Sequence, residues 1–384
     1  MTVLVFNELT APMLSWVLSG ADNKDYGSYV TIDIFRDDTA VISTNTLFAR
    51  SMEMDVDSDG KSHSASIPAS SISGLASAID EGDMLTINVD DEKDVVYVSC
   101  GSTTITLDNM FDVTPQVPHI AGSDTIASVS SAYDVIEALG TAAKLSPASG
   151  SIHLDSTADN LSVSVVSDGM ESKEVFPSTV VGDDEYHAMV SSKKLSALNA
   201  LKKIDLVDSL SIKQEQGALS FVFPINDPST EATRLEMAVP TIPEFFSEVD
   251  SPCDEDITEF AAVGKTDIKT VLSPLTAVVK NAVVEIDTSS GTTNGVALAV
   301  KEKGAAAKTV VMDAAVSSTA TVSVPLTMVM TALRNISTSQ VILGVVNFED
   351  SQWLTMMPSH DDDEDTGADL VIALQEITAY PPLV

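Results

Sequence analysis

Hydrophobic and polar positions along the chain follow one pattern that occurs three times. Three thirteen-residue stretches align without a gap: IPASSISGLASAI from Ile67, VSSKKLSALNALK from Val190 and VPLTMVMTALRNI from Val324. Each has the form of a strand end that enters a helix through Pro or Ser, with apolar or small residues at matching offsets. Successive copies lie 123 and 134 residues apart. The spacing indicates an internal repeat of domain size.

A second helical pattern precedes each of these stretches at a similar distance. It occurs near Met13, Val135 and Val271, at intervals of 122 and 136 residues. Runs of alternating apolar and polar residues lie between the two helical patterns of each copy and again after the second one. Each copy is therefore predicted to contain a helix, strands, a second helix and more strands.

Composition marks the boundaries between the copies. The stretches TPQVPHIAGSD (114–124) and SEVDSPCDEDI (247–257) are rich in Pro, Ser and acidic residues, as linkers usually are. The sequence therefore predicts an α+β chain of three tandem domains, at residues 1–118, 124–247 and 257–384.

The segment SSKKLSALNALKKIDLVD (191–208) carries a cluster of lysines beside an apolar stripe. The stripe consists of Leu195, Leu198, Leu201 and Ile204. Their spacing predicts a surface helix with one buried face. In such a helix Lys203 lies with Ser196 and Asn199 on the opposite face. Lys202 is then expected at the margin of that face, open to solvent.

Charge is distributed unevenly between the predicted elements. The chain has 57 acidic and 20 basic residues, yet six helical windows hold ten of the basic residues and only six of the acidic ones. The windows are 7–24, 68–80, 130–144, 190–204, 265–281 and 323–337. The basic residues in them are Lys24, Lys144, Lys193, Lys194, Lys202, Lys203, Lys265, Lys269, Lys280 and Arg334. This bias predicts that the helices share exposure to a polyanion, inside a ring with acidic sheets outside.

Overall composition is that of a folded, soluble protein. The formal net charge is −37, and 44% of the residues are hydrophobic, which is too apolar for a disordered acidic chain. The N-terminal stretch lacks the basic region of a signal peptide, and no apolar run is long enough to cross a membrane. We expect a cytoplasmic protein with no membrane partner. Cys100 and Cys253 are too few for a disulfide framework.

Three short motifs, in this order and spacing, resemble the bacterial-type (β) DNA polymerase III sliding clamp. VVSDGM (165–170) lies where that family has a Thr-Asp-Gly-His-Arg turn, and TIPEFF (241–246) matches its Phe-Pro-Asp-Tyr segment. YPPLV (380–384) lies where the family ends in Met-Pro-Met-Arg-Leu. Met170 and Glu171 replace the family's His-Arg and the final Arg is absent, which points to a changed partner groove and suits a phage-encoded clamp.

The resemblance covers essentially the whole chain and implies a function. It implies three clamp domains per chain and a homodimeric ring, with helices inside, that encircles duplex DNA without sequence specificity. As a processivity factor, the ring would tether a DNA polymerase and be opened by a clamp loader ATPase. It would need no cofactor and would act in the cytoplasm of a bacterial or phage-infected cell. The ten basic residues of the helical windows would contact DNA.

The resemblance also implies two protein-contact sites. A groove for partner peptides would be lined by Gly169, Met170, Pro243, Leu354, Met356, Tyr380, Pro381, Pro382, Leu383 and Val384. The dimer interface would involve Ile105 and Leu107 on one side and Val278 and Val279 on the other. For each interface residue, a place in the ordinary core is an equally good interpretation.

Other motifs are set aside. Residues 55–66 begin like a calcium-binding loop but have Ser66 where the closing Glu is required, so we expect a hairpin turn. The acidic run 360–365 is expected to be a loop between strands, and we assign no metal site. No nucleophile, P-loop or zinc motif is present, so we expect no enzymatic activity. The alternative function is an acidic, β-rich virion or surface assembly protein made of repeated modules.

Overall fold

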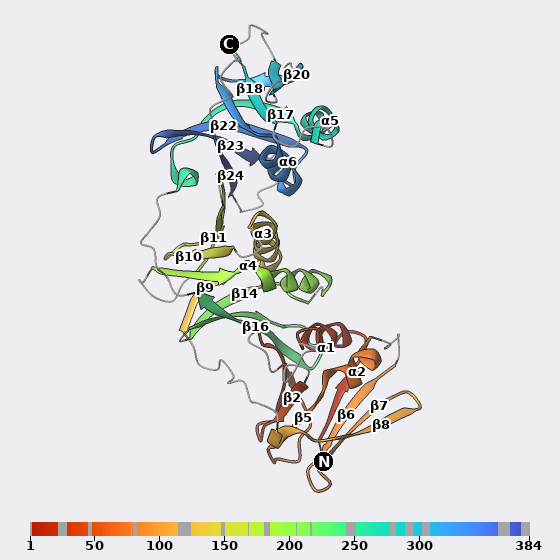
Figure 1. Ribbon diagram of the computed structural model, residues 1–384. Helices are drawn as coiled ribbons and strands as arrows, with labels where there is room; N and C mark the ends of the chain where they lie inside the picture. Colours follow the sequence, from red (N-terminus) through yellow and green to blue (C-terminus); the bar gives the residue numbers. More distant parts are fainter. Residues whose placement is uncertain are drawn as a thin grey trace.

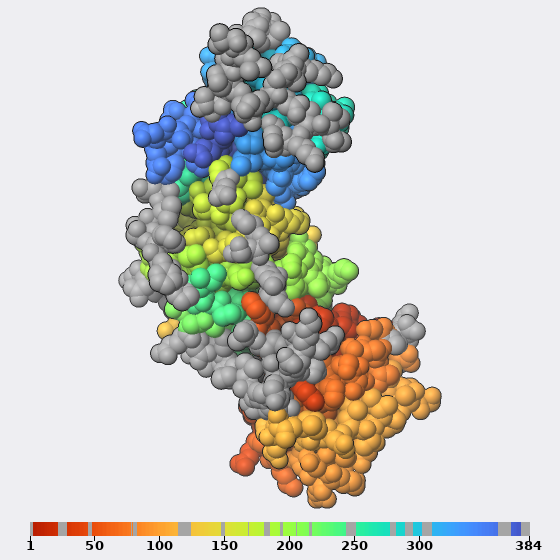
Figure 2. All heavy atoms as spheres, in the orientation of Figure 1, coloured from red at the N-terminus to blue at the C-terminus, as the bar shows by residue number. Residues whose placement is uncertain are grey.

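Three copies of one element order, strand, helix, four strands, helix, three strands, build the chain. The computed structural model describes residues 2–21, 29–44, 48–77, 79, 83–113, 124–146, 150–167, 169–179, 185–204, 206–215, 217–242, 251–276, 282–288, 295–301, 308–359 and 369–377. We call the copies unit one (β1 to β8), unit two (β9 to β16) and unit three (β17 to β24). They follow one another along an elongated molecule, from red and orange to blue (Figures 1 and 2).

The element bounds are as follows. Unit one contains β1 (Thr2–Phe6), α1 (Ala11–Leu18), β2 (Tyr29–Ile34), β3 (Thr39–Thr44), β4 (Arg50–Asp55), β5 (His63–Pro68), α2 (Ala69–Ala76), β6 (Leu85–Asp90), β7 (Val95–Cys100), β8 (Thr103–Asp108) and the turn η2 (Phe111–Val113). Unit two contains β9 (Asp124–Val129), α3 (Ala132–Leu145), β10 (Ser151–Ser156), β11 (Asn160–Ser167), β12 (Met170–Pro177), β13 (Tyr186–Ser191), α4 (Ser192–Leu195), η3 (Ser196–Lys203), β14 (Leu210–Glu215), β15 (Ala218–Pro224) and β16 (Ala232–Ile242). Unit three contains the turn η4 (Pro252–Asp254), β17 (Thr258–Gly264), α5 (Lys265–Thr276), β18 (Val283–Asp287), β19 (Gly295–Lys301), β20 (Lys308–Val316), β21 (Thr321–Pro325), α6 (Leu326–Asn335), β22 (Gln340–Phe348), β23 (Ser351–Pro358) and β24 (Asp369–Gln375).

All six predicted helical windows hold a helix, and the predicted α+β repeat is confirmed. Pro68 and Pro325 stand at the N-caps of α2 and α6, as the strand-to-helix pattern indicates. The calcium-loop-like stretch 55–66 runs from the end of β4 into β5, but these two strands lie at opposite edges of the sheet β5-β2-β3-β4. The expected hairpin turn was therefore wrong, and the stretch is a connection that crosses from one edge of the sheet to the other. Residues 114–123 of the first predicted linker and 247–250 of the second lie outside the described residues, so the domain limits at 1–118, 124–247 and 257–384 stay a prediction.

Each unit has two four-stranded antiparallel sheets. In unit one their orders are β5-β2-β3-β4 and β1-β6-β7-β8. Unit two repeats them as β13-β10-β11-β12 and β9-β14-β15-β16. Unit three repeats them as β21-β18-β19-β20 and β17-β22-β23-β24. Every unit therefore combines two four-stranded sheets with two helical segments.

The units are joined edge to edge by backbone hydrogen bonds. The fourth strand of unit one, β4, pairs with the last strand of unit two, β16. The fourth strand of unit two, β12, pairs in the same antiparallel sense with β24 of unit three. Each junction thus turns two four-stranded sheets into one sheet of eight strands.

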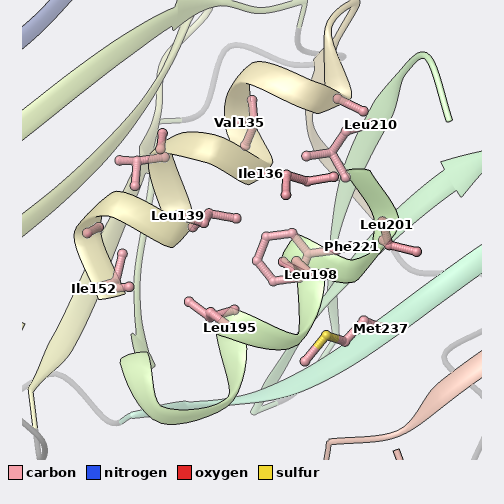
Figure 3. Close-up of a cluster of buried hydrophobic side chains, with 14 of the residues drawn as sticks. Val135, Ile136, Leu139, Ile152, Leu195, Leu198, Leu201, Leu210, Phe221 and Met237 are labelled. Atoms are coloured by element: carbon pink, nitrogen blue, oxygen red, sulfur yellow. The ribbon is translucent and has the colours of Figure 1, made fainter. Parts of the chain in front are cut away.

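The segment 196–203 differs from the predicted α-helix. It forms a 3₁₀ helix, η3, in which Leu198 and Leu201 are buried (Figure 3). A 3₁₀ helix has three residues per turn, so apolar residues spaced at intervals of three form one stripe, which packs against Leu139 of α3 and Phe221 of β15. The same period moves Lys202, and not Lys203, into line with Asn199. The expectation that Lys203 shares a face with Asn199 was wrong.

The helices α3 and η3 meet where Gly140 faces Asn199. A Cβ atom added at Gly140 would lie 2.7 Å from the Oδ1 atom of Asn199, so the end of the Asn199 side chain would have to move. The absence of a side chain at residue 140 leaves room for Asn199 against α3.

Trp16 of α1 anchors unit one to unit two. Its indole Nε1 donates a hydrogen bond of 3.1 Å to the backbone oxygen of Ala197 in η3. The guanidinium of Arg50 lies 5.3 Å from the centre of the Trp16 ring and donates to the Trp16 backbone oxygen. Burial lowers the pKa of Arg50. Arg50 therefore closes the end of α1 and holds Trp16 against the next unit.

His63 connects the two sheets of unit one. Its Nδ1 atom contacts Asp91 in the turn between β6 and β7, and its Nε2 atom lies 2.9 Å from Asp59. Burial alone would lower the pKa of His63, but hydrogen bonds to the two carboxylates outweigh it, so the pKa is raised. With a carboxylate at each ring nitrogen, the imidazolium form is favoured.

We expect this contact to make stability depend on pH. Because the folded-state pKa of His63 is raised, its contribution is fully present below the ordinary value of 6.5 and is lost as the pH rises through the folded-state pKa. His63→Gln should therefore lower the melting temperature more at pH 5.5 than at pH 9. Asp91→Asn removes one carboxylate partner of His63 and should reduce the same pH dependence of the melting temperature. An equal loss at both pH values would contradict this assignment.

Candidate nucleic-acid interface and protein-contact surfaces

The helices of all three units lie on one side of the row of units (Figure 1). We call the surface that they form the helix wall. Within each unit the two helical segments pack against each other, so equivalent helices come to equivalent places along the molecule. A ligand that lies along the wall would meet all three units.

Four of the predicted basic residues lie on the wall without an ion-pair partner among the described residues. Lys144, Lys203 and Arg334 are exposed, and Lys269 is half-buried. Lys144 and Arg334 lie in the last turns of α3 and α6, and Lys203 ends η3. The wall therefore presents cations from units two and three.

Two other predicted DNA contacts are already engaged within the chain. The Nζ atom of Lys265 donates to the backbone oxygen of Ile336 at the C-terminal end of α6. Burial and the neighbouring Lys269 lower the pKa of Lys265. The Nζ atom of Lys202 lies 3.2 Å from Glu137 on α3. The expectation that Lys202 is open to solvent was therefore wrong. Lys24, Lys280 and the side chains of Lys193 and Lys194 lie outside what the structure describes.

Unit one contributes less charge than the sequence windows indicated. The helices α1 and α2, as the structure bounds them, contain no charged residue. On α3 the acids Asp134 and Glu137 lie within the first two turns. Burial and repulsion from these two carboxylates raise the pKa of Glu174 on β12 to about 8. The helix wall is therefore uncharged along α1 and α2 of unit one and carries both acidic and basic residues in unit two.

Comparison with known proteins identifies the architecture. No protein-family model and no curated protein sequence matches the chain. Solved structures do match over nearly its full length. A DNA polymerase sliding clamp from Pseudomonas aeruginosa is 12% identical, with a TM-score of 0.72 over 99% of this chain and 100% of that one. The DNA polymerase beta subunit of Streptococcus pyogenes gives the same identity, TM-score and coverage. A putative DNA polymerase III beta subunit from Eubacterium rectale is 14% identical, with a TM-score of 0.70 over 99% of this chain and 100% of that one.

The chain has the sliding-clamp fold. Its three units correspond to the repeated domains of that fold, and the α+β arrangement predicted from the sequence is confirmed. At 12 to 14% identity the likeness is one of architecture. The residues of each clamp surface have therefore to be judged from this structure.

The turn between β11 and β12 contains two of the residues predicted to line a peptide groove, Gly169 and Met170. Gly169 has a positive φ of 72°, a conformation that favours glycine, and Met170 next to it is buried. A Cβ at Gly169 would lie 3.4 Å from Met328 of α6 and 3.6 Å from Gln375 of β24. The turn thus lies where units two and three meet. The sequence analysis did not name Met328 and Gln375, because no local pattern shows which residues of unit three reach this turn.

Two predicted groove residues have no accessible surface. Leu354 and Met356 of β23 are completely buried in the core of unit three. Their side chains cannot line an open groove in this conformation, because successive strand residues alternate between faces and these two point inward. Pro243 and the five residues from Tyr380 to Val384 lie outside the described residues.

The turn η4 and the residue before it, Ser251, pack beside the seam between β12 and β24. Glu171 accepts a hydrogen bond from Ser251, and Lys173 pairs with Asp254 of η4. Burial is the main cause that raises the pKa of Glu171, and burial also raises the pKa of the Cys253 thiol to about 12. The Glu that replaces the family's Arg therefore has a structural contact, and Cys253 is an unreactive thiol.

The strands β8 of unit one and β20 of unit three, which lie at the two ends of the described part of the molecule, each have an edge with unpaired backbone groups. β8 pairs only with β7 among the described strands. β20 pairs with β19, and its last residues, Ala314 to Val316, pair with β17, which leaves Lys308 to Asp313 unpaired on that edge. Ile105 and Leu107 of β8 are half-buried against their own core. Val278 and Val279 lie outside the described residues.

Metal-binding and membrane-spanning features were also sought. The described residues contain no group of three or more His, Cys, Asp or Glu side chains placed to hold a metal ion. None of the described helices has the length and apolar composition that a membrane span requires.

Proposed function

We propose that the chain is a sliding clamp, a non-enzymatic processivity factor. Two copies close head to tail into a ring around duplex DNA and hold a DNA polymerase on it. The helix wall lines the hole, and its cations contact phosphates without reading bases, so the ring can slide. Solved structures that share the full-length fold are described as DNA polymerase sliding clamps. The alternative of a virion assembly protein has no comparable support.

Complementarity of the two free edges carries this proposal. At both internal junctions a fourth strand pairs with the eighth strand of the next unit, over five residues in β4 (Arg50 to Met54) and six in β12 (Met170 to Val175). The two edges that remain unpaired among the described strands are of the same two kinds. One belongs to β20, the fourth strand of unit three, at Lys308 to Asp313, and the other to β8, the eighth strand of unit one. A head-to-tail contact between copies repeats the internal junction, and two such contacts close a ring of six units.

Side-chain burial along the seams supports the same pairing. At the internal junctions the inward-facing residues beside the seam are fully buried, as Met52, Leu235 and Ile372 show. Their counterparts at the free edges, Leu107 and Val310, remain partly exposed. Pairing of β8 with β20 of a second copy would bury this remaining apolar surface, and burial of apolar surface is the main favourable term in association. Val278 and Val279 are proposed to add to the contact.

The remaining partners follow from a closed ring. A closed ring does not thread itself onto DNA, so we propose a clamp loader ATPase as a partner, with the polymerase as the main client. Client peptides are proposed to bind in a groove beside Gly169 and Met170. Met328 and Gln375 join the residues proposed to line this groove, whereas the buried Leu354 and Met356 no longer belong to them. Pro243 and the tail residues remain part of this proposed groove. The chain itself is proposed to need no cofactor and to act in the cytoplasm.

The oligomeric state tests the ring. We expect sedimentation to give twice the 40.4 kDa mass of one chain, independent of dilution through the low micromolar range. A monomer or an open-ended polymer would contradict the proposed closure.

The tail tests the groove. Deletion of Tyr380 to Val384 should abolish binding of a polymerase-derived peptide while sparing the dimer. The tail is apolar and its two prolines cannot donate to a β-ladder, so we propose that it lines the groove. Each lost apolar contact is worth on the order of 1 kcal/mol to a bound peptide. Peptide affinity and dimer mass are measured on one sample. Surviving affinity would remove the tail from the groove, and dissociation would assign it to the ring.

A further inference from the structure

Lys202 is surrounded by groups of α3. Its Nζ atom lies 3.2 Å from Oε2 of Glu137 and 4.8 Å from the centre of the Tyr133 ring. The Lys202 side chain is only 22% exposed, whereas that of Glu137 is 50% exposed and Tyr133 is 52% exposed. The lysine is therefore directed back onto its own unit, between a carboxylate and the face of an aromatic ring.

Its neighbour Lys203 has the opposite environment. Lys203 is exposed and has no ion-pair partner among the described residues. The difference follows from the 3₁₀ geometry of η3, which aligns Lys202 with Asn199 on the side that packs against Gly140 of α3. Two adjacent lysines of one helix thus differ in how freely they can meet an approaching anion.

Acidic groups gather around Lys202. Glu137 and Asp134 on α3 and Lys202 itself all act on Glu174 of β12, whose pKa is raised to about 8, so Glu174 is largely protonated at neutral pH. A DNA phosphate that approaches Lys202 has to compete with the Glu137 carboxylate and is repelled by Asp134. Salt dependence of DNA binding arises from counterions that leave the DNA when protein cations neutralise its phosphates. A lysine that stays paired with a carboxylate neutralises no phosphate and therefore adds little to this dependence.

We propose that Glu137 and Tyr133 are positioning residues that withhold Lys202 from DNA and so weaken the grip of the helix wall. The inference rests on the proposed clamp function and deepens it. Lys203 contacts phosphate, whereas Lys202 is held by α3. A ring retained by topology does not need strong contacts, and fewer phosphate contacts leave the DNA easier to slide along.

The test measures binding of a short fluorescent linear duplex to the intact dimer between 50 and 200 mM salt. Lys203→Gln should reduce the slope of log K against log salt by about 0.9, which is about 3.5-fold in affinity change over this range. Lys202→Gln should leave the slope unchanged. Glu137→Gln should increase the slope by about 0.9, because it frees Lys202, and the double variant with Lys202→Gln should return it to the original value.

Two further variants separate positioning from fold support. Glu137→Asp keeps the charge and should retain the original slope, and Tyr133→Phe keeps the ring and should do the same. The melting temperature of each variant shows that the fold is intact. If Glu137→Gln leaves the slope unchanged or lowers it while Lys203→Gln lowers it, this inference is wrong and the clamp proposal stands. If neither Lys203→Gln nor Lys144→Gln changes the slope, the helix wall does not contact DNA and both proposals fall.

Discussion

Ile105→Asp together with Leu107→Asp should convert the dimer into a folded monomer. The two side chains lie half-buried on the inward face of β8, beside the edge that is proposed to pair with β20 of the second copy. Closure of the ring would remove the new carboxylates from water without a partner, and such burial costs several kcal/mol per charge. Sedimentation should give half the original mass, with loss of retention on circular DNA.

Thr104→Asp with Thr106→Asp is the matched control for this experiment. These residues are exposed and alternate with Ile105 and Leu107, so they point to the opposite face of β8. The control should remain dimeric. Circular dichroism and the melting temperature show whether each variant is folded, and Ile105→Ser with Leu107→Ser gives a milder pair. A folded aspartate or serine pair that stays fully dimeric would place the interface elsewhere.

Trp16→Ala should give the largest loss of stability among single changes at the unit junctions. Trp16 is buried, contacts Arg50 through its ring and donates to Ala197 of unit two. Truncation of a buried Trp to Ala typically costs about 3 to 5 kcal/mol, through lost transfer energy and the cavity that remains. The free energy of the first urea transition measures the loss.

Trp16→Phe separates the ring from the hydrogen bond. Phenylalanine keeps most of the apolar packing but has no N–H to donate to Ala197, so a loss of about 1 kcal/mol is expected. Similar losses for Ala and Phe would mean that the hydrogen bond, and not the packed ring, holds unit one to unit two. A loss below about 1 kcal/mol for Trp16→Ala would show that α1 does not anchor the junction.

Local features of the fold could be predicted from the sequence because they depend on residues close together in the chain. The three repeats, the six helices and the strand-to-helix entries at Pro68 and Pro325 were all present in the periodic pattern. One local signal was misinterpreted. Leu195, Leu198, Leu201 and Ile204 are separated by three residues each time, which is the period of a 3₁₀ helix, and an α-helix would alternate steps of three and four.

Contacts between units could not be predicted in the same way. Trp16 meets Ala197 181 residues away, and Glu53 accepts from Thr233 180 residues away. No periodicity encodes such pairs, because they follow from how β4 and β16 align at the junction.

A contact within unit two could not be predicted either. The ion pair between Lys202 and Glu137 joins two helices that are distant in sequence, so the count of lysines per helix overstated the free charge of the wall.

Retention on circular DNA tests the central claim most directly. Chains are loaded onto a nicked circular duplex by a clamp loader ATPase with ATP, separated from free protein by gel filtration at high salt, and then exposed to a restriction enzyme that cuts the circle once. We expect the protein to stay on the circular DNA through high salt and to be lost when the DNA becomes linear, because a sliding ring leaves by the ends. Protein that remains bound after the cut, or that high salt alone removes from the intact circle, would contradict it.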